Sequence, residues 1–412
     1  MHQPDLITTL ACGMAAALGL GYLTHRLGLS PIVGYLLAGV AVGPHTPGFV
    51  ADKHLADQLA EVGVILLMFG VGLHFHLEDL LAVRRVAVPG ALVQILAATA
   101  LGAGVAAAFG WEWRAAVVFG LCVSVASTVV LTRVLGDRNE LHTPLGHTAV
   151  GWLVVQDLFA VFVLVLLPAL FGAGGADAGR LAGLVALAAL KIVALGVLVL
   201  LVGGRVVPWL LKHVAAARSR ELFTLTVLVV ALGIAVGSAM AFGVSMALGA
   251  FLAGMVVGRS DFSLRAATDA LPMRDAFAVV FFVSVGMMFD PAFLPKVPGL
   301  VAATLAVVVL GTPAATFAVV LLLGRPVRSA VGLGLALGQI GEFSFILATL
   351  GKSLGAIPDE AVQAVVAVAI VSISVNPLVY RLAGPIDRWV AARPRLVRRL
   401  AARARLERAR AA

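Results

Sequence analysis

Charged residues are scarce in this sequence: Asp, Glu, Lys and Arg make up 12% of its 412 residues, about half the share found in soluble globular domains. Hydrophobic residues make up 61%, and they gather in repeated runs of about twenty. Short segments of alternating polarity, which are typical of membrane β-barrels, are absent. The sequence therefore excludes a soluble protein and a barrel, and it predicts an all-α polytopic membrane protein.

Residues that support other classes of function are also missing. The two cysteines, Cys12 and Cys122, both lie in apolar runs, which excludes a disulfide framework. No Ser/His/Asp arrangement or metal-ligand spacing occurs in the apolar segments, so we expect neither an enzyme nor a cofactor. No basic residue lies where a symporter for organic anions would need one. The first apolar run lacks the positive start of a signal peptide, so a retained helix is expected.

The apolar runs predict about thirteen transmembrane segments. Their ranges are 6–24, 30–43, 57–76, 88–109, 114–135, 146–171, 181–211, 221–240, 243–258, 274–289, 298–323, 328–350 and 361–383. The second and ninth are short and rich in glycine, so they are not expected to cross as uniform helices. The seventh is long and ends in a basic amphipathic stretch, which indicates a part lying along the membrane surface.

Lysine and arginine indicate how the segments are oriented. With the N-terminus outside, the loops assigned to the inside carry most basic residues, and an Arg-rich tail at 391–412 adds more. The loops assigned to the outside contain Lys53, Arg114, Arg180, Lys296 and Lys352. The positive-inside rule therefore predicts an inner (plasma) membrane protein with a cytoplasmic tail that lies against anionic lipid headgroups. The net charge of +9 then needs no nucleic-acid partner.

An internal repeat divides a predicted membrane domain of residues 1–390. Residues 34–43 match 249–258 at an offset of 215, and residues 71–75 match 285–289 at an offset of 214. The offset spans an odd number of segments, so the second copy is inverted. The predicted parts are repeat one (6–171), a linking helix (181–211) and repeat two (221–383). Inverted repeats are a common construction of secondary transporters.

The sixth segment carries a carboxylate, Asp157, with no Lys or Arg nearby in the sequence. A charge at this depth costs about 3 kcal/mol or more, so such residues usually serve an ion pathway. A dehydrated monovalent cation needs oxygen ligands with negative charge, and a proton can take the same carboxylate. We therefore predict that Asp157 and the neutral oxygen of Gln156 bind a transported K⁺ or Na⁺, in exchange for one H⁺ on Asp157. The alternative is a packing carboxylate held in an ion pair.

Two other segments are expected to be interrupted at mid-depth. The small or polar residues there are Ser124, Ser127 and Thr128 in the fifth segment, and Gln339, Gly341 and Glu342 in the twelfth. The offset of 214 makes Thr128 and Glu342 counterparts. Unwound backbone can bind a cation through its carbonyl groups, whereas Ser and Thr can instead bond back to their own helices. Glu342 is expected to stabilise helix N-termini at the break, or else to belong to the proton path.

Around these residues the chain resembles the Kef-type branch of the monovalent cation:proton antiporter-2 (CPA2) family. The matching stretches are 30–39, 64–72, 127–128, 156–157, 282–286 and 339–343. The resemblance implies the sodium/proton antiporter fold with crossed discontinuous helices, a homodimer and elevator-like alternating access. It also implies an ion site at Asp157, Gln156, Ser127 and Thr128. The Gln-Asp pair is similar to that of the potassium-preferring branch.

Two departures from the family bear on function. Many relatives carry a Lys in the eleventh segment that pairs with the core carboxylates, and residues 310–314 contain none. Kef-type proteins also usually continue into a cytoplasmic nucleotide-binding domain, whereas no Gly-rich fingerprint follows residue 400. We therefore expect a truncated chain or a natural short form, with any nucleotide-binding domain missing from it.

Taken together, these features predict an electroneutral secondary transporter that exchanges K⁺, or less favourably Na⁺, for H⁺. The alternative is a gated, channel-like potassium efflux path in which Asp157 only attracts cations. The two differ in coupling, because cation flux through an antiporter is tied to an opposite proton flux and flux through a channel is not.

Overall fold

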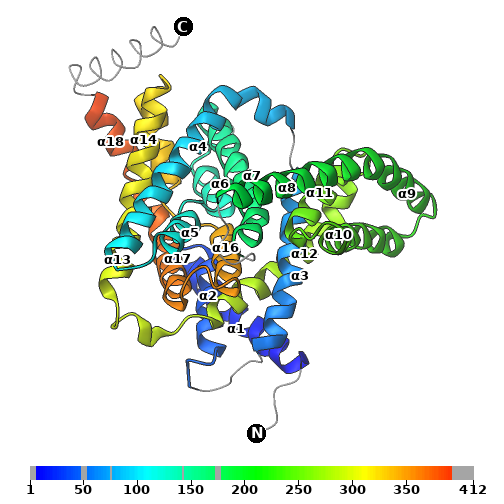
Figure 1. Cartoon of the computed structure of the whole chain (residues 1–412), viewed down its shortest axis with the longest axis horizontal. Helices are drawn as coiled ribbons and strands as arrows, with labels where there is room; N and C mark the ends of the chain where they lie inside the picture. Colours follow the sequence, from blue (N-terminus) through cyan, green and yellow to red (C-terminus); the bar gives the residue numbers. More distant parts are fainter. Residues whose placement is uncertain (1–5, 48–52, 75–76, 142, 172–177, 392–412) are drawn as a thin grey trace. The chain divides into compact units, whose positions relative to one another are not determined.

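The computed structural model describes residues 6–47, 53–74, 77–141, 143–171 and 178–391. Within these ranges the regular secondary structure is helical, as predicted (Figure 1). The α-helices are α1 (Leu6–Arg26), α2 (Pro31–Val42), α3 (Lys53–His74), α4 (Leu77–Ala108), α5 (Trp113–Val123), α6 (Thr128–Gly136), α7 (Pro144–Phe171), α8 (Ala178–Leu198), α9 (Gly204–Ala216), α10 (Arg220–Phe242), α11 (Met246–Gly258), α12 (Ser263–Met287), α13 (Pro298–Ala306), α14 (Thr312–Leu322), α15 (Val327–Ala336), α16 (Glu342–Ser353), α17 (Asp359–Tyr380) and α18 (Ala383–Ala391). Short π or 3₁₀ turns are η1 (Val199–Gly203), η2 (Pro291–Phe293) and η3 (Val307–Gly311). The predicted Arg-rich tail lies outside the described residues beyond Ala391.

Eight helices among the described residues are long and apolar enough to cross a membrane, so the protein is a multi-pass membrane protein. They are Ile7–Arg26, Val83–Ala108, Pro144–Pro168, Val193–Ala216, Arg220–Phe242, Ser263–Met287, Pro298–Leu322 and Asp359–Tyr380. Each falls in a different predicted segment. The other predicted segments contain the shorter apolar helices Pro31–Val42, Gln58–Leu73, Trp113–Val123, Met246–Gly258 and Val327–Ala336. The total of thirteen crossings stays a prediction.

Both predicted interruptions are present. The fifth segment divides into α5 and α6 with residues 124–127 between them, and the twelfth divides into α15 and α16 with residues 337–341 between them. The restart of α6 has a local cause. The hydroxyl of Ser127 accepts a hydrogen bond from the backbone N–H of Val130 at 3.2 Å, which caps the first turn of the new helix.

The helices form two compact units, and each unit draws on both halves of the sequence repeat. The first unit contains α1, most of α2, α3, the end of α7 and α8–α12. The second unit contains α4–α6, the first part of α7 and α13–α18. The sequence repeat and the compact units therefore divide the chain differently, because helices from the two halves pack together.

In the first unit, two close helix contacts are copies of one another. A Cβ atom added to Gly39 of α2 would lie 2.7 Å from the Cα of Gly286 in α12, and one added to Gly254 of α11 would lie 3.0 Å from the carbonyl carbon of Gly72 in α3. Gly39 and Gly254 are related by the offset of 215, and Gly72 and Gly286 by 214. Each half therefore supplies one helix to each contact, as the predicted repeat would require; the inverted repeat itself stays a prediction.

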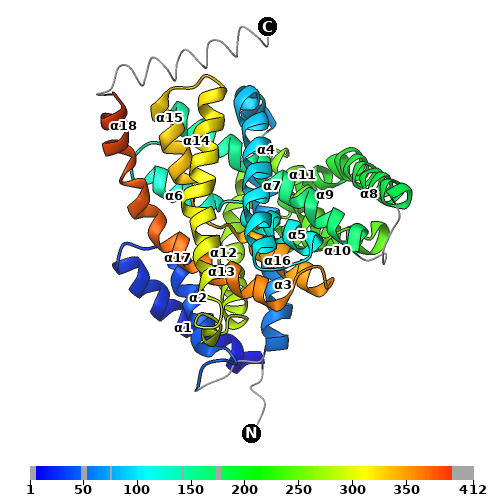
Figure 2. The same ribbon diagram turned by 60° about the vertical axis from the view of Figure 1, so that its left-hand side comes forward.

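The second unit repeats a contact in the same way. A Cβ atom added to Gly120 in α5 would lie 2.2 Å from the carbonyl oxygen of Thr99 in α4. One added to Gly334 in α15 would lie 2.8 Å from the carbonyl oxygen of Pro313 in α14. Gly120 and Gly334 are related by the offset of 214, and so are Thr99 and Pro313. Glycine lets each pair of backbones approach closely, and α14 and α15 are seen side by side in Figure 2.

We expect Gly120→Ala to destabilise the protein, because the new methyl group would overlap the backbone of α4. The cost is about 1–3 kcal/mol, the usual range for overpacking. Gly104→Ala on α4 is the matched control, since a Cβ atom there meets nothing within 4 Å. Thermal unfolding in detergent should show a lower Tm for Gly120→Ala and an unchanged or slightly higher Tm for Gly104→Ala. Equal Tm values for the two variants would contradict the close contact.

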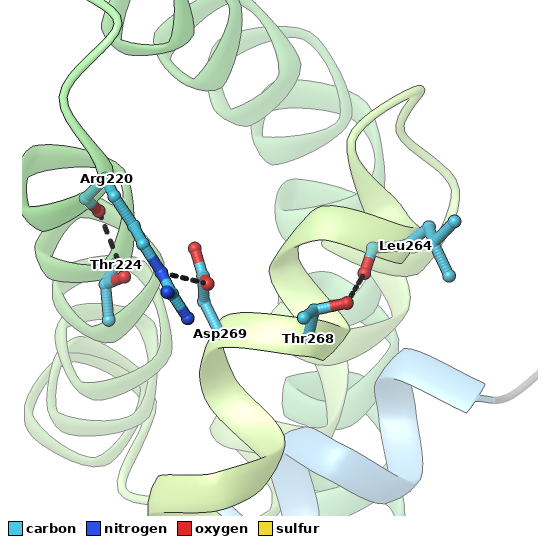
Figure 3. Close-up of polar contacts among 5 residues, drawn as sticks. All are labelled: Arg220, Thr224, Leu264, Thr268 and Asp269. Carbon is cyan, nitrogen blue, oxygen red and sulfur yellow. Dashed lines mark hydrogen bonds and ion pairs between the residues drawn. The ribbon is translucent and has the colours of Figure 1, made fainter.

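An ion pair in the first unit lies in the part of α12 that precedes the predicted range of 274–289. Asp269 lies in the early, more polar part of α12, and its side chain is 5% exposed. Its Oδ1 atom lies 3.2 Å from Nε of Arg220, the first residue of α10 (Figure 3). A buried carboxylate needs such a partner. Apolarity detects only the later part of α12, because the earlier turns carry several polar and charged residues.

Candidate functional site

The residues predicted for the site all lie in the second unit, around the two interruptions and α7. They are Ser124, Ser127, Thr128, Gln156, Asp157, Gln339, Gly341 and Glu342. Except for Thr128, which is partly buried, their environment is closed to solvent. The structure therefore brings together residues that are separated by more than two hundred positions in the chain.

Hydrogen bonds join the two interruptions directly. The backbone N–H of Gly341 donates to the carbonyl of Val125 at 3.0 Å. The side-chain amide of Gln339 accepts from the N–H of Ser127 at 3.0 Å and donates to the carbonyl of the same residue at 3.1 Å. The backbone groups released by one broken helix are thus satisfied by the other, which non-helical backbone at membrane depth requires. Gln339 and Gly341 hold the crossing together.

The first interruption is also held from its other side. Gln156 of α7 accepts, through Oε1, a hydrogen bond from the N–H of Ala126 at 3.2 Å. The carbonyl of Ser124 accepts from Nε2 of Gln94, in α4, at 3.2 Å. The hydroxyl of Ser124 donates back to its own helix, to the carbonyl of Leu121 at 2.9 Å. Of the predicted ligands, Gln156 therefore has a definite second role in supporting the unwound backbone.

Asp157 is the next residue of α7 and is 4% exposed. Its Oδ2 atom accepts a hydrogen bond from the hydroxyl of Thr128, the first residue of α6, at 3.2 Å. Its Oδ1 atom is buried and accepts no hydrogen bond from the described residues. No Lys or Arg of the described part of the chain forms an ion pair with it. A buried carboxylate in this state is costly unless a cation or a proton accompanies it.

Glu342 lies across the crossing as the first residue of α16 and is 4% exposed. Its position in the first turn suits the predicted stabilisation of a helix N-terminus. The residue before it, Gly341, bonds to Val125 of the first interruption, so Glu342 and Asp157 belong to the same crossing. Two like charges in one buried site favour the uptake of a positive ion between or beside them. The two predicted roles of Glu342 are therefore compatible in this geometry.

Sequence reasoning missed Gln94 and Trp152, which complete this site. Gln94 is fully buried in α4, and its Oε1 atom accepts hydrogen bonds from Gln156 Nε2 and from the indole N–H of Trp152, the latter at 3.4 Å. The available signal was a single amide residue inside the apolar fourth segment. A lone Gln of this kind needs a buried partner, but the sequence does not say which one.

The comparisons with known proteins agree with this architecture. The family model "Sodium/hydrogen exchanger, transmembrane" matches residues 13–382. The chain is 52% identical over 384 residues to "Putative cation/proton antiporter YbaL" of Escherichia coli (strain K12), covering 92% of this chain and 69% of that protein. It is 33% identical over 380 residues to K(+) efflux antiporter 4 of Arabidopsis thaliana, covering 92% of this chain and 64% of that protein.

A solved structure shares the fold. The sodium proton antiporter MjNhaP1 from Methanocaldococcus jannaschii superposes with a TM-score of 0.64 at 17% sequence identity, covering 93% of this chain and 97% of that one. The predicted sodium/proton antiporter fold is thereby confirmed, as is the resemblance to the CPA2 group. With nearly its whole membrane region matched, the chain belongs to the sodium/hydrogen exchanger family.

Proposed function

We propose that this protein exchanges a monovalent cation for a proton across the membrane, with K⁺ preferred over Na⁺. Asp157 is the shared site: its carboxylate binds the cation in one step and a proton in another. Exchange at a single carboxylate moves one positive charge each way, so the cycle is electroneutral. The names of the relatives support cation/proton exchange and potassium efflux as the class of activity.

One observation carries the proposal: the buried Asp157 has a carboxylate oxygen that accepts no hydrogen bond from the described residues. The hydroxyl of Thr128 donates to the other oxygen of Asp157. The preceding residue of α7, Gln156, has a neutral side-chain oxygen at the interruption. These groups offer the hard oxygen ligands that alkali cations take. Glu342 is a second buried carboxyl group at the same crossing, and a carboxylate there favours a cation over an anion as the substrate.

The placement of the site within one compact unit supports elevator-like transport, in which that unit carries the site from one side of the membrane to the other. Helices that hold the site on both sides of the crossing would then move as one body. We further propose a homodimer in the inner (plasma) membrane, with the N-terminus outside and the C-terminal tail in the cytoplasm. These features follow the family resemblance and the distribution of Lys and Arg.

The test is proton movement into sealed proteoliposomes that contain a pH-sensitive dye, after pulses of K⁺, Na⁺ or Li⁺. In one set of vesicles the membrane potential is clamped with an ionophore and a permeant ion other than K⁺. In the other set the membrane potential is left free. We expect K⁺-driven proton movement that does not change with the clamp. Cation flux without proton movement would reject exchange and favour the channel-like alternative. Proton movement that follows the imposed potential would reject electroneutral coupling.

A further inference from the structure

Gln94 links three parts of the site region within the second unit. It lies in α4, one turn after Gly90, where the missing side chain leaves room for the ring of Trp152 against the helix. Its amide then contacts Trp152, Gln156 and the carbonyl of Ser124. Gln94 thus connects α4 and α7 to the unwound backbone of the fifth segment.

The donor and the acceptor of every hydrogen bond in this group are determined by two N–H groups, which can only donate. The backbone N–H of Ala126 can only donate, so Gln156 must present its oxygen there and its NH₂ group to Gln94. The indole N–H of Trp152 can also only donate, and it reaches the same oxygen of Gln94. The NH₂ group of Gln94 is then left for the carbonyl of Ser124. An ionised carboxylate at position 94 or 156 would remove a required donor.

We call this chain of hydrogen bonds, from Ala126 through Gln156 and Gln94 to Ser124, the relay. The second interruption shows that a broken helix does not need such a relay. There the N–H of Ile340, the counterpart of Ala126 at the offset of 214, donates to the hydroxyl of Ser372 at 3.3 Å. The position that corresponds to Gln94 is Val308. A short hydroxyl therefore caps the same backbone position without a second amide behind it. The relay occurs only on the side of the repeat that also carries the buried carboxylate of α7.

We propose that Gln94 is a positioning residue of the cation site. It holds the amide of Gln156 against the interruption, with the oxygen toward Ala126 and the NH₂ group toward Gln94, beside the single charged ligand that α7 contributes, Asp157. Loss of Gln94 frees the amide of Gln156 to rotate, and the oxygens beside Asp157 are then no longer arranged for one dehydrated cation. The inference rests on the proposed exchange at Asp157.

Three variants test the inference in the proteoliposome assay. Gln94→Met keeps the length of the side chain and removes its hydrogen bonds. Gln94→Glu can replace the amide only while its carboxyl is protonated, since it then offers one O–H donor and one acceptor oxygen. Gln363→Met is the matched control, because it makes the same chemical change in the same compact unit at a side chain that accepts from the backbone N–H of Asp290 and not from the site. The measured quantities are the KM for K⁺, the maximal rate and the pH profile.

Gln94→Met is expected to raise the KM for K⁺ about tenfold or more, the usual effect of removing a group that orients a ligand, with a smaller change in maximal rate. Gln363→Met should change the KM less than about threefold. Gln94→Glu should transport at acidic pH and lose transport at alkaline pH where the wild type is still active. Its profile must be compared with that of the wild type, because the site already contains two carboxyl groups, those of Asp157 and Glu342.

Two results would overturn the inference. One is a folded Gln94→Met protein with the wild-type KM and pH profile, which would leave Gln94 a packing residue. If Gln94→Met does not fold, the pH profile of Gln94→Glu decides, and a profile parallel to the wild type rejects the relay. Failure of the proposed function is distinguished by the wild type itself: without K⁺-coupled proton movement, both the exchange at Asp157 and this inference are rejected.

Discussion

Replacement of Asp157 by Asn is expected to abolish cation-driven proton movement. The substitution keeps the shape of the side chain but removes the charge that binds the cation and the group that binds the proton. Loss of one partner of a buried charge pair typically costs about 3–5 kcal/mol, which corresponds to a decrease in transport of about 100-fold or more. The measurement is the initial rate of proton movement in proteoliposomes after a K⁺ pulse.

Asp359→Asn is the matched control for this prediction. It makes the same chemical change in the same compact unit, but Asp359 is 73% exposed in the first turn of α17 and pairs with Lys352 on the surface. Surface ion pairs contribute little, so this variant should transport at close to the wild-type rate. Asp157→Asn should also fold normally, because it relieves an uncompensated buried charge. Residual K⁺-coupled transport above about a tenth of the wild-type rate would place the shared site elsewhere.

Gly341→Ala is expected to cause the second largest loss, through the geometry of the crossing. A Cβ atom at Gly341 would lie 2.6 Å from the carbonyl oxygen of Ala126 and 2.8 Å from the backbone N of Ser127. These atoms cannot move aside without breaking the bonds that Gln339 makes to Ser127. Overpacking costs about 1–3 kcal/mol, and each broken hydrogen bond adds about 1 kcal/mol. We expect a lower Tm and a decrease in transport of about tenfold or more.

Gly136→Ala provides the comparison for Gly341→Ala. Gly136 is the last residue of α6 in the same unit, and a Cβ atom there meets nothing within 4 Å. This variant should retain both its Tm and its transport rate. Thermal unfolding and proton movement are measured on the same preparations, so that a loss of transport is not confused with a loss of folded protein. Wild-type transport by Gly341→Ala would show that the crossing tolerates a side chain at this point.

The interruptions could be predicted because their cause is local. Ser127 has a hydroxyl that caps a restarting helix, and Gly341 has no side chain to fill space, so both weaken a continuous helix in an otherwise apolar segment. Asp157 could be predicted for a similar reason, since a carboxylate among apolar residues is detectable without any knowledge of its neighbours. The repeat could be predicted because glycines that permit close helix contacts recur at offsets of 214 or 215.

The partners of these residues could not be predicted from the sequence. The sequence alone determined that this is a multi-pass helical protein with two broken segments and one buried carboxylate in the sixth. Only the tertiary structure decided which groups form hydrogen bonds: Gln339 with Ser127, Gln156 with Ala126, and Gln94 with Gln156. The physical reason is that hydrogen-bond partners at membrane depth are selected by which helices cross, over separations at which local propensity and hydrophobic pattern carry no information.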